Sequence, residues 1–141
     1  MNLYAESSAV LSWLFGEPKA SDVRRHLTRA DLVLTSDLTL VECERAIIRA
    51  EALDGISPRR ASSCRSRLLE AAAGWNVLRI AADVTVRARQ RFPNEPIRAL
   101  DALHLASAEL GRSAVLDLKM LSLDKRIRTA AAAMEFEIVP K

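Results

Sequence analysis

Four acidic residues, far apart in this 141-residue chain, have the residue types expected of a metal site: Glu6, Glu42, Asp101 and Asp124. A carboxylate among apolar neighbours costs free energy unless something offsets that cost, and converging carboxylates repel one another unless a cation joins them. Hard divalent cations such as Mg²⁺ and Mn²⁺ prefer oxygen ligands. We therefore expect these four acids to be catalytic and to bind metal, with Glu42 ligating directly or through water. The chemistry that suits such a site is metal-assisted phosphodiester hydrolysis.

Glu6 and Asp124 each follow an apolar run that is typical of a strand. Glu6 ends the run Leu3–Ala5, and Asp124 follows Leu121–Leu123. In open parallel sheets, sites form beyond the carboxyl ends of the strands, so we expect these two side chains to meet. Each also has a structural alternative. Glu6 can stabilise the start of the next helix by ~0.3–1 kcal/mol, and Asp124 can cap the helix that follows it.

Glu42 and Asp101 lie inside helical patterns. The alternative role for Glu42 is a surface ion pair with Arg45, and for Asp101 it is a pair with Arg98, three residues earlier. Asp101 is the harder of the two to explain in this way, because its helical neighbours are apolar. Asp117 is a weaker candidate for the fourth acid, since no clear strand ends before it.

Polar side chains near the acids are candidates for contacts with the carboxylates or with substrate: Ser7, Ser8, Arg98, His104, Ser122 and Arg126. His104 comes one turn after Asp101 and shares its face, where we expect it to hydrogen-bond a carboxylate or a backbone carbonyl rather than to transfer protons. A serine hydroxyl can bond a carboxylate, a metal-bound water or a phosphate. The arginines can neutralise substrate phosphate or pair with the acids.

Four short motifs, in this order, resemble those of one known family. Tyr4–Ala9 is similar to its N-terminal signature, a hydrophobic residue and an Asp followed by hydroxyl residues and Ala. Arg98–Ala108 is close to its most specific motif, and Ser122–Arg126 to the motif that ends a strand. Ala130–Ala131 and Val139–Pro140 match its tail. These are the marks of PIN-domain proteins, in particular of the VapC toxins of bacterial toxin–antitoxin pairs, and the resemblance covers essentially the whole chain.

The resemblance implies a PIN-like fold and a metal-dependent endoribonuclease that uses Mg²⁺ or Mn²⁺. The substrate it implies is RNA, cut so as to inhibit translation. It also implies a homodimer and a VapB-type antitoxin whose tail covers the active-site groove.

The one departure from the family pattern is Glu6, where the family has Asp. The extra methylene moves the carboxylate by roughly 1 Å or more, whereas Mg²⁺ requires near-octahedral geometry at ~2.0–2.1 Å. A misplacement of ~1 Å can cost ~10²-fold in rate. A second hypothesis therefore stays open, a weak or inactive PIN domain that binds RNA or antitoxin. A third is a PIN-like RNA-processing protein without an antitoxin.

Length and composition agree with a single domain over 1–141 that has one hydrophobic core. Half of the residues are hydrophobic and 28% are charged, which excludes a disordered chain. We expect a cytoplasmic protein with no membrane segment and two thiols, Cys43 and Cys64, that are buried and unpaired. The net charge is +3, with 17 Arg against 4 Lys, a bias that suits a phosphate-binding partner but also accompanies G+C-rich genomes.

Apolar runs and helix signals alternate along the chain. Strands are expected at 3–6, 32–35, 76–80, 121–123 and around 138. Helices are expected at 8–15, 19–30, 38–53, 58–73, 82–92, 98–110 and 125–134, with 112–119 ambiguous between a loop and an extra strand. This order predicts an α/β fold, a PIN-like parallel sheet of about five strands with helices on both faces.

Overall fold

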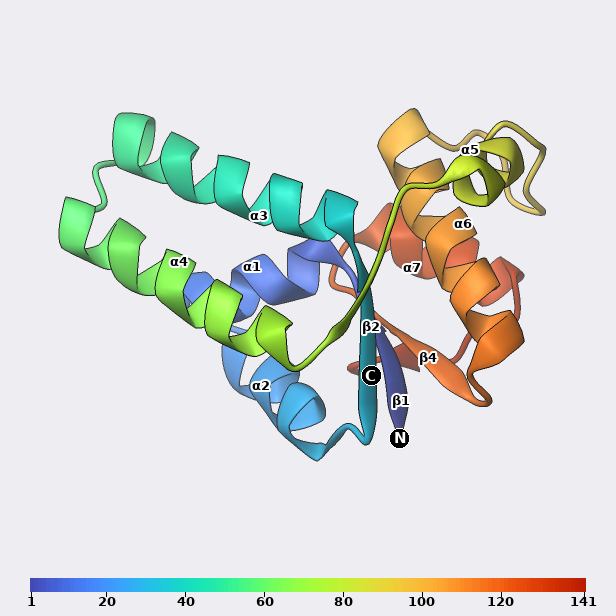
Figure 1. Ribbon diagram of the computed structural model, residues 1–141, viewed down its shortest axis with the longest axis horizontal. Coiled ribbons are helices and arrows are strands. Elements are labelled where there is room, and N and C mark those ends of the chain that lie inside the picture. The colour runs from blue at the N-terminus through green and yellow to red at the C-terminus, as the bar shows by residue number, and fades with distance from the viewer.

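Five parallel strands form one sheet in the computed structural model, with helices on both of its faces (Figure 1). The structure describes residues 1–141, except for the side chain of Asp54. The strand order is β3-β2-β1-β4-β5. The bounds are β1 Asn2–Ala5, β2 Leu32–Ser36, β3 Asn76–Leu78, β4 Leu118–Leu121 and β5 Ile138–Val139. The predicted fold class is confirmed.

The helices divide into two groups, one on each side of the sheet (Figure 1). One group is α1 (Ser7–Phe15), α2 (Ala20–Arg29), α3 (Asp37–Arg49) and α4 (Pro58–Ala73), with a π-helical turn, η1 (Ala50–Asp54), extending α3. The other is α5 (Ala82–Ala88), α6 (Ala99–Ala114) and α7 (Lys125–Ala133). No helix among the described residues is long and apolar enough to cross a bilayer.

The alternation of side chains along β1 creates two hydrophobic cores, because successive residues of a strand point to opposite faces. Leu3 and Ala5 pack with α1, α3 and α4 on one face, whereas Tyr4 packs with α6 and α7 on the other. All three side chains are fully buried. Cys43 and Cys64 are buried free thiols in the first of these cores, as expected.

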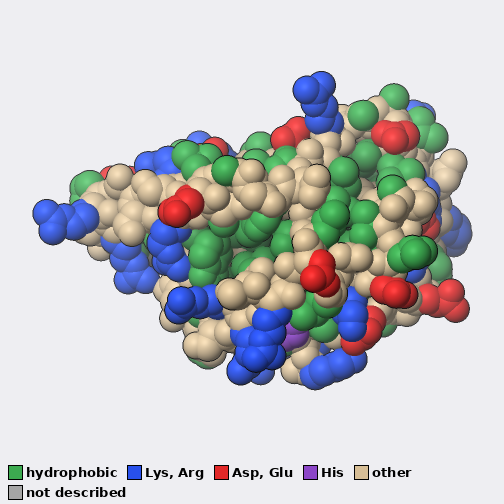
Figure 2. All heavy atoms as spheres, turned by 60° about the horizontal axis from the view of Figure 1, so that its bottom comes forward, with side chains coloured by type: hydrophobic (Ala, Val, Ile, Leu, Met, Phe, Trp, Pro, Cys, Tyr) green, Lys and Arg blue, Asp and Glu red, His purple; other side chains and the backbone are tan. Residues whose placement is uncertain are grey.

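Local sequence signals explain most helix starts. Ser36 accepts a hydrogen bond from the Leu38 N–H at the start of α3, and Ser57 accepts one from the Arg60 N–H at the start of α4. Pro58 occupies the first position of α4, where its missing N–H costs nothing. α3 and α4 form a hairpin that projects away from the sheet (Figure 1). In Figure 2 basic side chains lie along this projecting end, as expected of solvated helix faces.

Three predicted boundaries were wrong in the second half of the chain. The helix expected at 98–110 continues to Ala114. The strand expected at 121–123 is residues Leu118–Leu121, so the segment 112–119 is divided between the end of α6, a turn and this strand. Charged Lys119 interrupts an apolar run whose buried members, Leu118 and Met120, face the core. The helix expected at 82–92 ends at Ala88, because Glu95 holds the following segment as a turn by accepting the backbone N–H groups of residues 92 and 97.

Buried side chains of α6 should carry the stability of this part of the fold. Leu105 is fully buried, whereas Leu100 on the same helix is 50% exposed. We expect Leu105→Ala to lower the free energy of unfolding by about 2–5 kcal/mol, through lost burial and the cavity left behind. Leu100→Ala is the matched control and should change it by less than about 0.5 kcal/mol. Urea denaturation measures both, and equal effects would contradict this assignment of the core.

Candidate active site

The carboxyl ends of β1 and β4 bring two of the four acids to one edge of the sheet. Ala5 pairs with Leu121, so that Glu6 and the segment leading to Asp124 leave the sheet side by side. Glu42 lies in the second turn of α3, and Asp101 in the first turn of α6. Asp117, the weaker candidate for the fourth acid, is exposed and precedes β4, at the opposite end of that strand.

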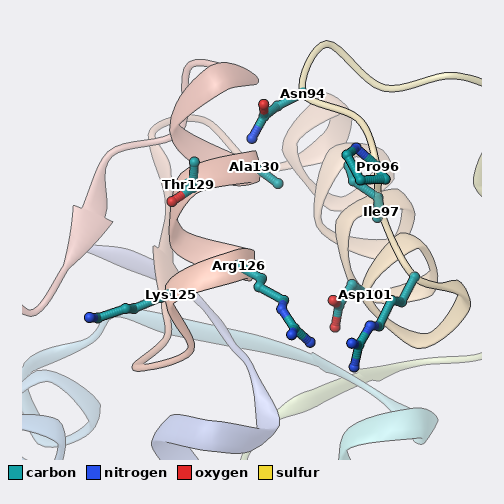
Figure 3. Close-up of a pocket in the computed structure, with 9 residues that line it drawn as sticks. Asn94, Pro96, Ile97, Asp101, Lys125, Arg126, Thr129 and Ala130 are labelled. Atoms are coloured by element: carbon teal, nitrogen blue, oxygen red, sulfur yellow. The ribbon is translucent and has the colours of Figure 1, made fainter.

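The negative charges of two of the other acids affect the pKa of Asp101. Its side chain is half-buried at the wall of a pocket (Figure 3). Burial, followed by the negative charge of Asp124, raises the pKa of Asp101 above its usual value, and Glu42 adds to this rise. His104 and Arg126 oppose it in part. Burial and the charges of Asp124 and Glu42 therefore make ionisation of Asp101 less favourable in the metal-free protein.

Asp124 caps α7 as its alternative role predicted. Its Oδ1 accepts the backbone N–H groups of Arg126 at 2.8 Å and of Ile127 at 3.1 Å. Both bonds go to one oxygen, so capping is compatible with a second role for the other oxygen.

Glu42 belongs to a buried hydrogen-bond chain. Its Oε1 accepts the Ser7 hydroxyl at 2.7 Å and lies 2.5 Å from His104 Nε2, while Nδ1 of the same ring lies 3.1 Å from the Tyr4 hydroxyl. Burial and the charge of Glu6 raise the pKa of Tyr4, so its hydroxyl keeps its proton and can donate to Nδ1. Nε2 then carries the proton that it donates to Glu42. His104 thus bonds a carboxylate, as expected.

These contacts determine the protonation of Glu42. Burial alone would raise the pKa of its carboxyl, but the hydrogen bonds from His104 and Ser7 outweigh burial and lower it. The Glu42 carboxylate is therefore ionised and held in one orientation, as a metal ligand would be. It is not the surface partner of Arg45 that its alternative role suggested.

Glu6 is placed differently from the other acids. It is 5% exposed, and its carboxylate accepts hydrogen bonds from the Ser8 N–H, the Ser8 hydroxyl and the Ser122 hydroxyl. It is the N-cap of α1, so it does stabilise the start of the next helix, which was its structural alternative. The role of Glu6 as a metal ligand stays a prediction.

A pocket of about 490 Å³ opens beside Asp101, between the start of α6 and α7 (Figure 3). Its polar lining includes Arg98 and Arg126, both nominated from the sequence. The sequence did not nominate three further polar residues that line it: Asn94, Lys125 and Thr129. Lys125 stands inside the Ser122–Arg126 motif, a signal that could have identified it, whereas Asn94 and Thr129 carry no such signal.

The donor set suits a hard divalent cation, because carboxylate oxygens are the ligands that Mg²⁺ and Mn²⁺ prefer. The negative charge around Asp101 is what a cation would offset. Among the residues that the structure describes, however, no three His, Cys, Asp or Glu side chains are already arranged as an ion-binding group. Metal binding by the four acids is therefore a hypothesis for experiment.

Comparisons with known proteins identify the family of this chain. The family model described as PIN domain matches residues 3–133. Two ribonucleases of Mycobacterium tuberculosis are each 31% identical to this chain. VapC46 aligns over 97% of this chain and 95% of its own length, and VapC35 over 99% and 87%.

Solved structures share the fold at low sequence identity. The M. tuberculosis toxin VapC20, described as cleaving the sarcin–ricin loop, superposes with a TM-score of 0.64 at 16% identity, covering 91% of this chain and 94% of that one. The FitAB complex bound to DNA gives a TM-score of 0.68 at 17% identity, covering 98% and 93%. A toxin–antitoxin complex from Klebsiella pneumoniae gives 0.64 at 17%, covering 99% and 97%.

Neutralising Asp101 should not destabilise the metal-free protein. Because its pKa is raised, its ionised form weakens the fold once the pH exceeds that pKa. We expect Asp101→Asn in EDTA at pH 7 to have a Tm equal to or above that of the wild type, with any gain shrinking as the pH falls toward about 4. The exposed acid of Glu70→Gln is the matched control and should show no such pH-dependent gain. A lower Tm for Asp101→Asn at pH 7 would contradict the crowding of negative charge.

Replacing His104 should remove a hydrogen bond that holds the Glu42 carboxylate and lowers its pKa. His104→Ala leaves a cavity and a half-buried carboxylate without its donor, so we expect the free energy of unfolding to fall by about 2–4 kcal/mol. The pKa of Glu42, followed by carbon NMR, should rise because burial then prevails. The control is His26→Ala in α2, which should leave the pKa of Glu42 unchanged. An unchanged pKa in both variants would show that His104 does not hold this carboxylate.

Proposed function

We propose that this chain, which belongs to the PIN domain family, is a metal-dependent endoribonuclease toxin that hydrolyses RNA phosphodiester bonds and so inhibits translation. The observation that carries the proposal is that acidic and basic side chains lie together at one pocket. Asp101, with the charges of Asp124 and Glu42 beside it, borders a pocket lined by Arg98, Lys125 and Arg126. The family and its ribonuclease relatives, similar over nearly the whole chain, support the choice of RNA.

The basic side chains of the pocket have the chemistry to bind the RNA backbone. Arginine donates two parallel hydrogen bonds to a phosphate, and lysine acts as a point charge. In Figure 3 the side chain of Arg126 extends from α7 toward Asp101 on α6. A phosphodiester held by Arg98 and Arg126 would therefore lie next to the carboxylates, which is the placement that hydrolysis needs.

The carboxylates are proposed to hold one or two Mg²⁺ or Mn²⁺ ions. Asp101 and Asp124 would be ligands, with Glu42 ligating directly or through water, and the sequence indicated Glu6 as a further ligand. The chemistry that such a cation supplies is activation of water and neutralisation of charge on the reacting phosphate. The residues of the chain supply orientation: His104 and Ser7 fix Glu42, and the cap of α7 fixes Asp124.

A VapB-type antitoxin is the proposed protein partner, and a homodimer the proposed assembly. The support for the antitoxin is that structures of the same fold include toxin–antitoxin complexes. We propose a cytoplasmic location, because the proposed action on cellular RNA and on translation takes place there.

Purified protein should cleave RNA only with a divalent cation. We expect cleavage with Mg²⁺ or Mn²⁺, none in EDTA, and a loss of at least ~10²-fold in Asp101→Asn, since one ligand is removed with little change in volume. Glu70→Gln, the charge-matched control on α4, should keep full activity. Activity that is equal in EDTA would overturn the metal dependence. RNA binding by a wild-type protein that cleaves nothing with either metal would favour the inactive binding module instead.

The basic pocket should set substrate affinity more than turnover. We expect Arg126→Ala to raise the KM for RNA by about 10-fold, with a shallower dependence of binding on salt because one phosphate contact is lost. Arg59→Ala, on the projecting hairpin, is the control and should leave KM unchanged. Steady-state cleavage at several salt concentrations measures both, and an unaltered salt slope in Arg126→Ala would place the RNA elsewhere.

A further inference from the structure

The carboxylate of Glu6 is the acceptor at the centre of a buried network that joins two strand ends. Its Oε1 accepts the Ser8 N–H at 3.1 Å. Its Oε2 accepts the hydroxyl of Ser8 and, at 2.7 Å, the hydroxyl of Ser122. Ser122 follows β4, 116 residues along the chain from Glu6. One side chain therefore links the segment after β1 to the segment after β4.

The Ser8 hydroxyl extends this link to the backbone before α7. Its Oγ accepts the N–H groups of Leu123 at 2.9 Å and Asp124 at 3.0 Å. A serine hydroxyl has one proton and two lone pairs. Because both lone pairs accept backbone N–H groups, the single proton is committed to Glu6.

Ser122 repeats the pattern. Its Oγ donates to Glu6 and accepts the Asp124 N–H at 3.1 Å. The backbone N–H of Asp124 is thus held by two hydroxyls, and both hydroxyls are oriented by the same carboxylate. Three hydrogen-bond donors from Ser8 and Ser122 thus converge on the carboxylate of Glu6.

We propose that Glu6 is a positioning residue, which acts through Ser8 and Ser122 to fix the backbone of Leu123–Asp124, and that it does not ligate the metal. The inference rests on the proposed function only in taking Asp124 as a ligand. Glu6 is almost fully buried, while Glu42, Asp101 and Asp124 are each partly exposed. The side-chain length fits this role, because the extra methylene relative to Asp lets one carboxylate reach its own cap and Ser122 together.

The metal-free protein tests the network directly. In EDTA we expect Glu6→Gln to lower the Tm by roughly 3–10 °C, because an amide NH₂ then faces a buried donor. Amide hydrogen exchange at Leu123 and Asp124 should speed up in Glu6→Gln and in Ser8→Ala. Ser66→Ala, an exposed serine of α4, is the matched control and should change neither quantity.

A double-mutant cycle separates a network from independent contacts. If Glu6 acts through Ser122, the losses in Tm for Glu6→Gln and Ser122→Ala will not add in the double variant, because each removes the same linkage. Glu6→Asp keeps the charge but shortens the reach, so it should lose the protection of the Asp124 amide as Ser122→Ala does. The Glu6→Asp variant therefore still tests the proposal if the Glu6→Gln protein fails to fold.

Affinity for Mn²⁺ distinguishes positioning from ligation. Positioning predicts that Glu6→Gln, Ser8→Ala and Ser122→Ala each weaken Mn²⁺ binding by a similar factor, about 10-fold, as outer partners of a metal site do. A ligand role would be shown by an unchanged or higher Tm of Glu6→Gln in EDTA together with a much larger loss of affinity than in the serine variants. That result would overturn the proposal.

The outcome does not depend on catalysis. If wild-type protein neither cleaves RNA nor binds Mn²⁺, the proposed function fails, but exchange at Leu123 and Asp124 still decides whether Glu6 holds this backbone. Unchanged exchange in Glu6→Gln and Glu6→Asp would overturn the proposal even in an active enzyme.

Discussion

The parallel pairing of β1 with β4 is the constraint on which the rest of the site depends. Ala5 lies opposite Leu121, and the Glu6 N–H continues the ladder by donating to the Leu121 carbonyl at 3.0 Å. The Ser122 N–H extends the pairing to β5 in the same way, by donating to the Val139 carbonyl at 3.1 Å. The segments that follow β1 and β4 therefore leave the sheet at one edge. Every contact between them follows from this register.

The four acids differ in how the fold satisfies their carboxylates. Glu6 and Glu42 are satisfied by donors: hydroxyls and an N–H for Glu6, and Ser7 with His104 for Glu42. Asp101 is not satisfied in this way, and burial, followed by the charge of Asp124, raises its pKa. The unfavourable interaction between these two carboxylates occurs where Asp101 borders the basic pocket. A divalent cation is the partner that would remove it, and the pocket arginines would then face substrate phosphate.

The sequence predicted the order of elements and the parallel sheet, because both follow from local patterns and from the geometry of parallel strands. It could not predict partners across the sheet. Ser7 and Ser8 are adjacent, yet Ser7 bonds Glu42 on α3 while Ser8 bonds the segment after β4. Which hydroxyl faces which element depends on the packing of α1. Likewise, the pocket combines Asn94 from the segment after α5 with Thr129 from α7, a pairing that depends on how these elements pack.

A crystal structure with Mn²⁺, located by its anomalous scattering, tests the central claim most directly. The account predicts an ion at ~2.0–2.2 Å from carboxylate oxygens of Asp101 and Asp124, with Glu42 bound to it directly or through water. Glu6 should still bond Ser8 and Ser122 in that structure. An ion bound away from Asp101 and Asp124, or one held by a Glu6 that has left both serines, would contradict the account.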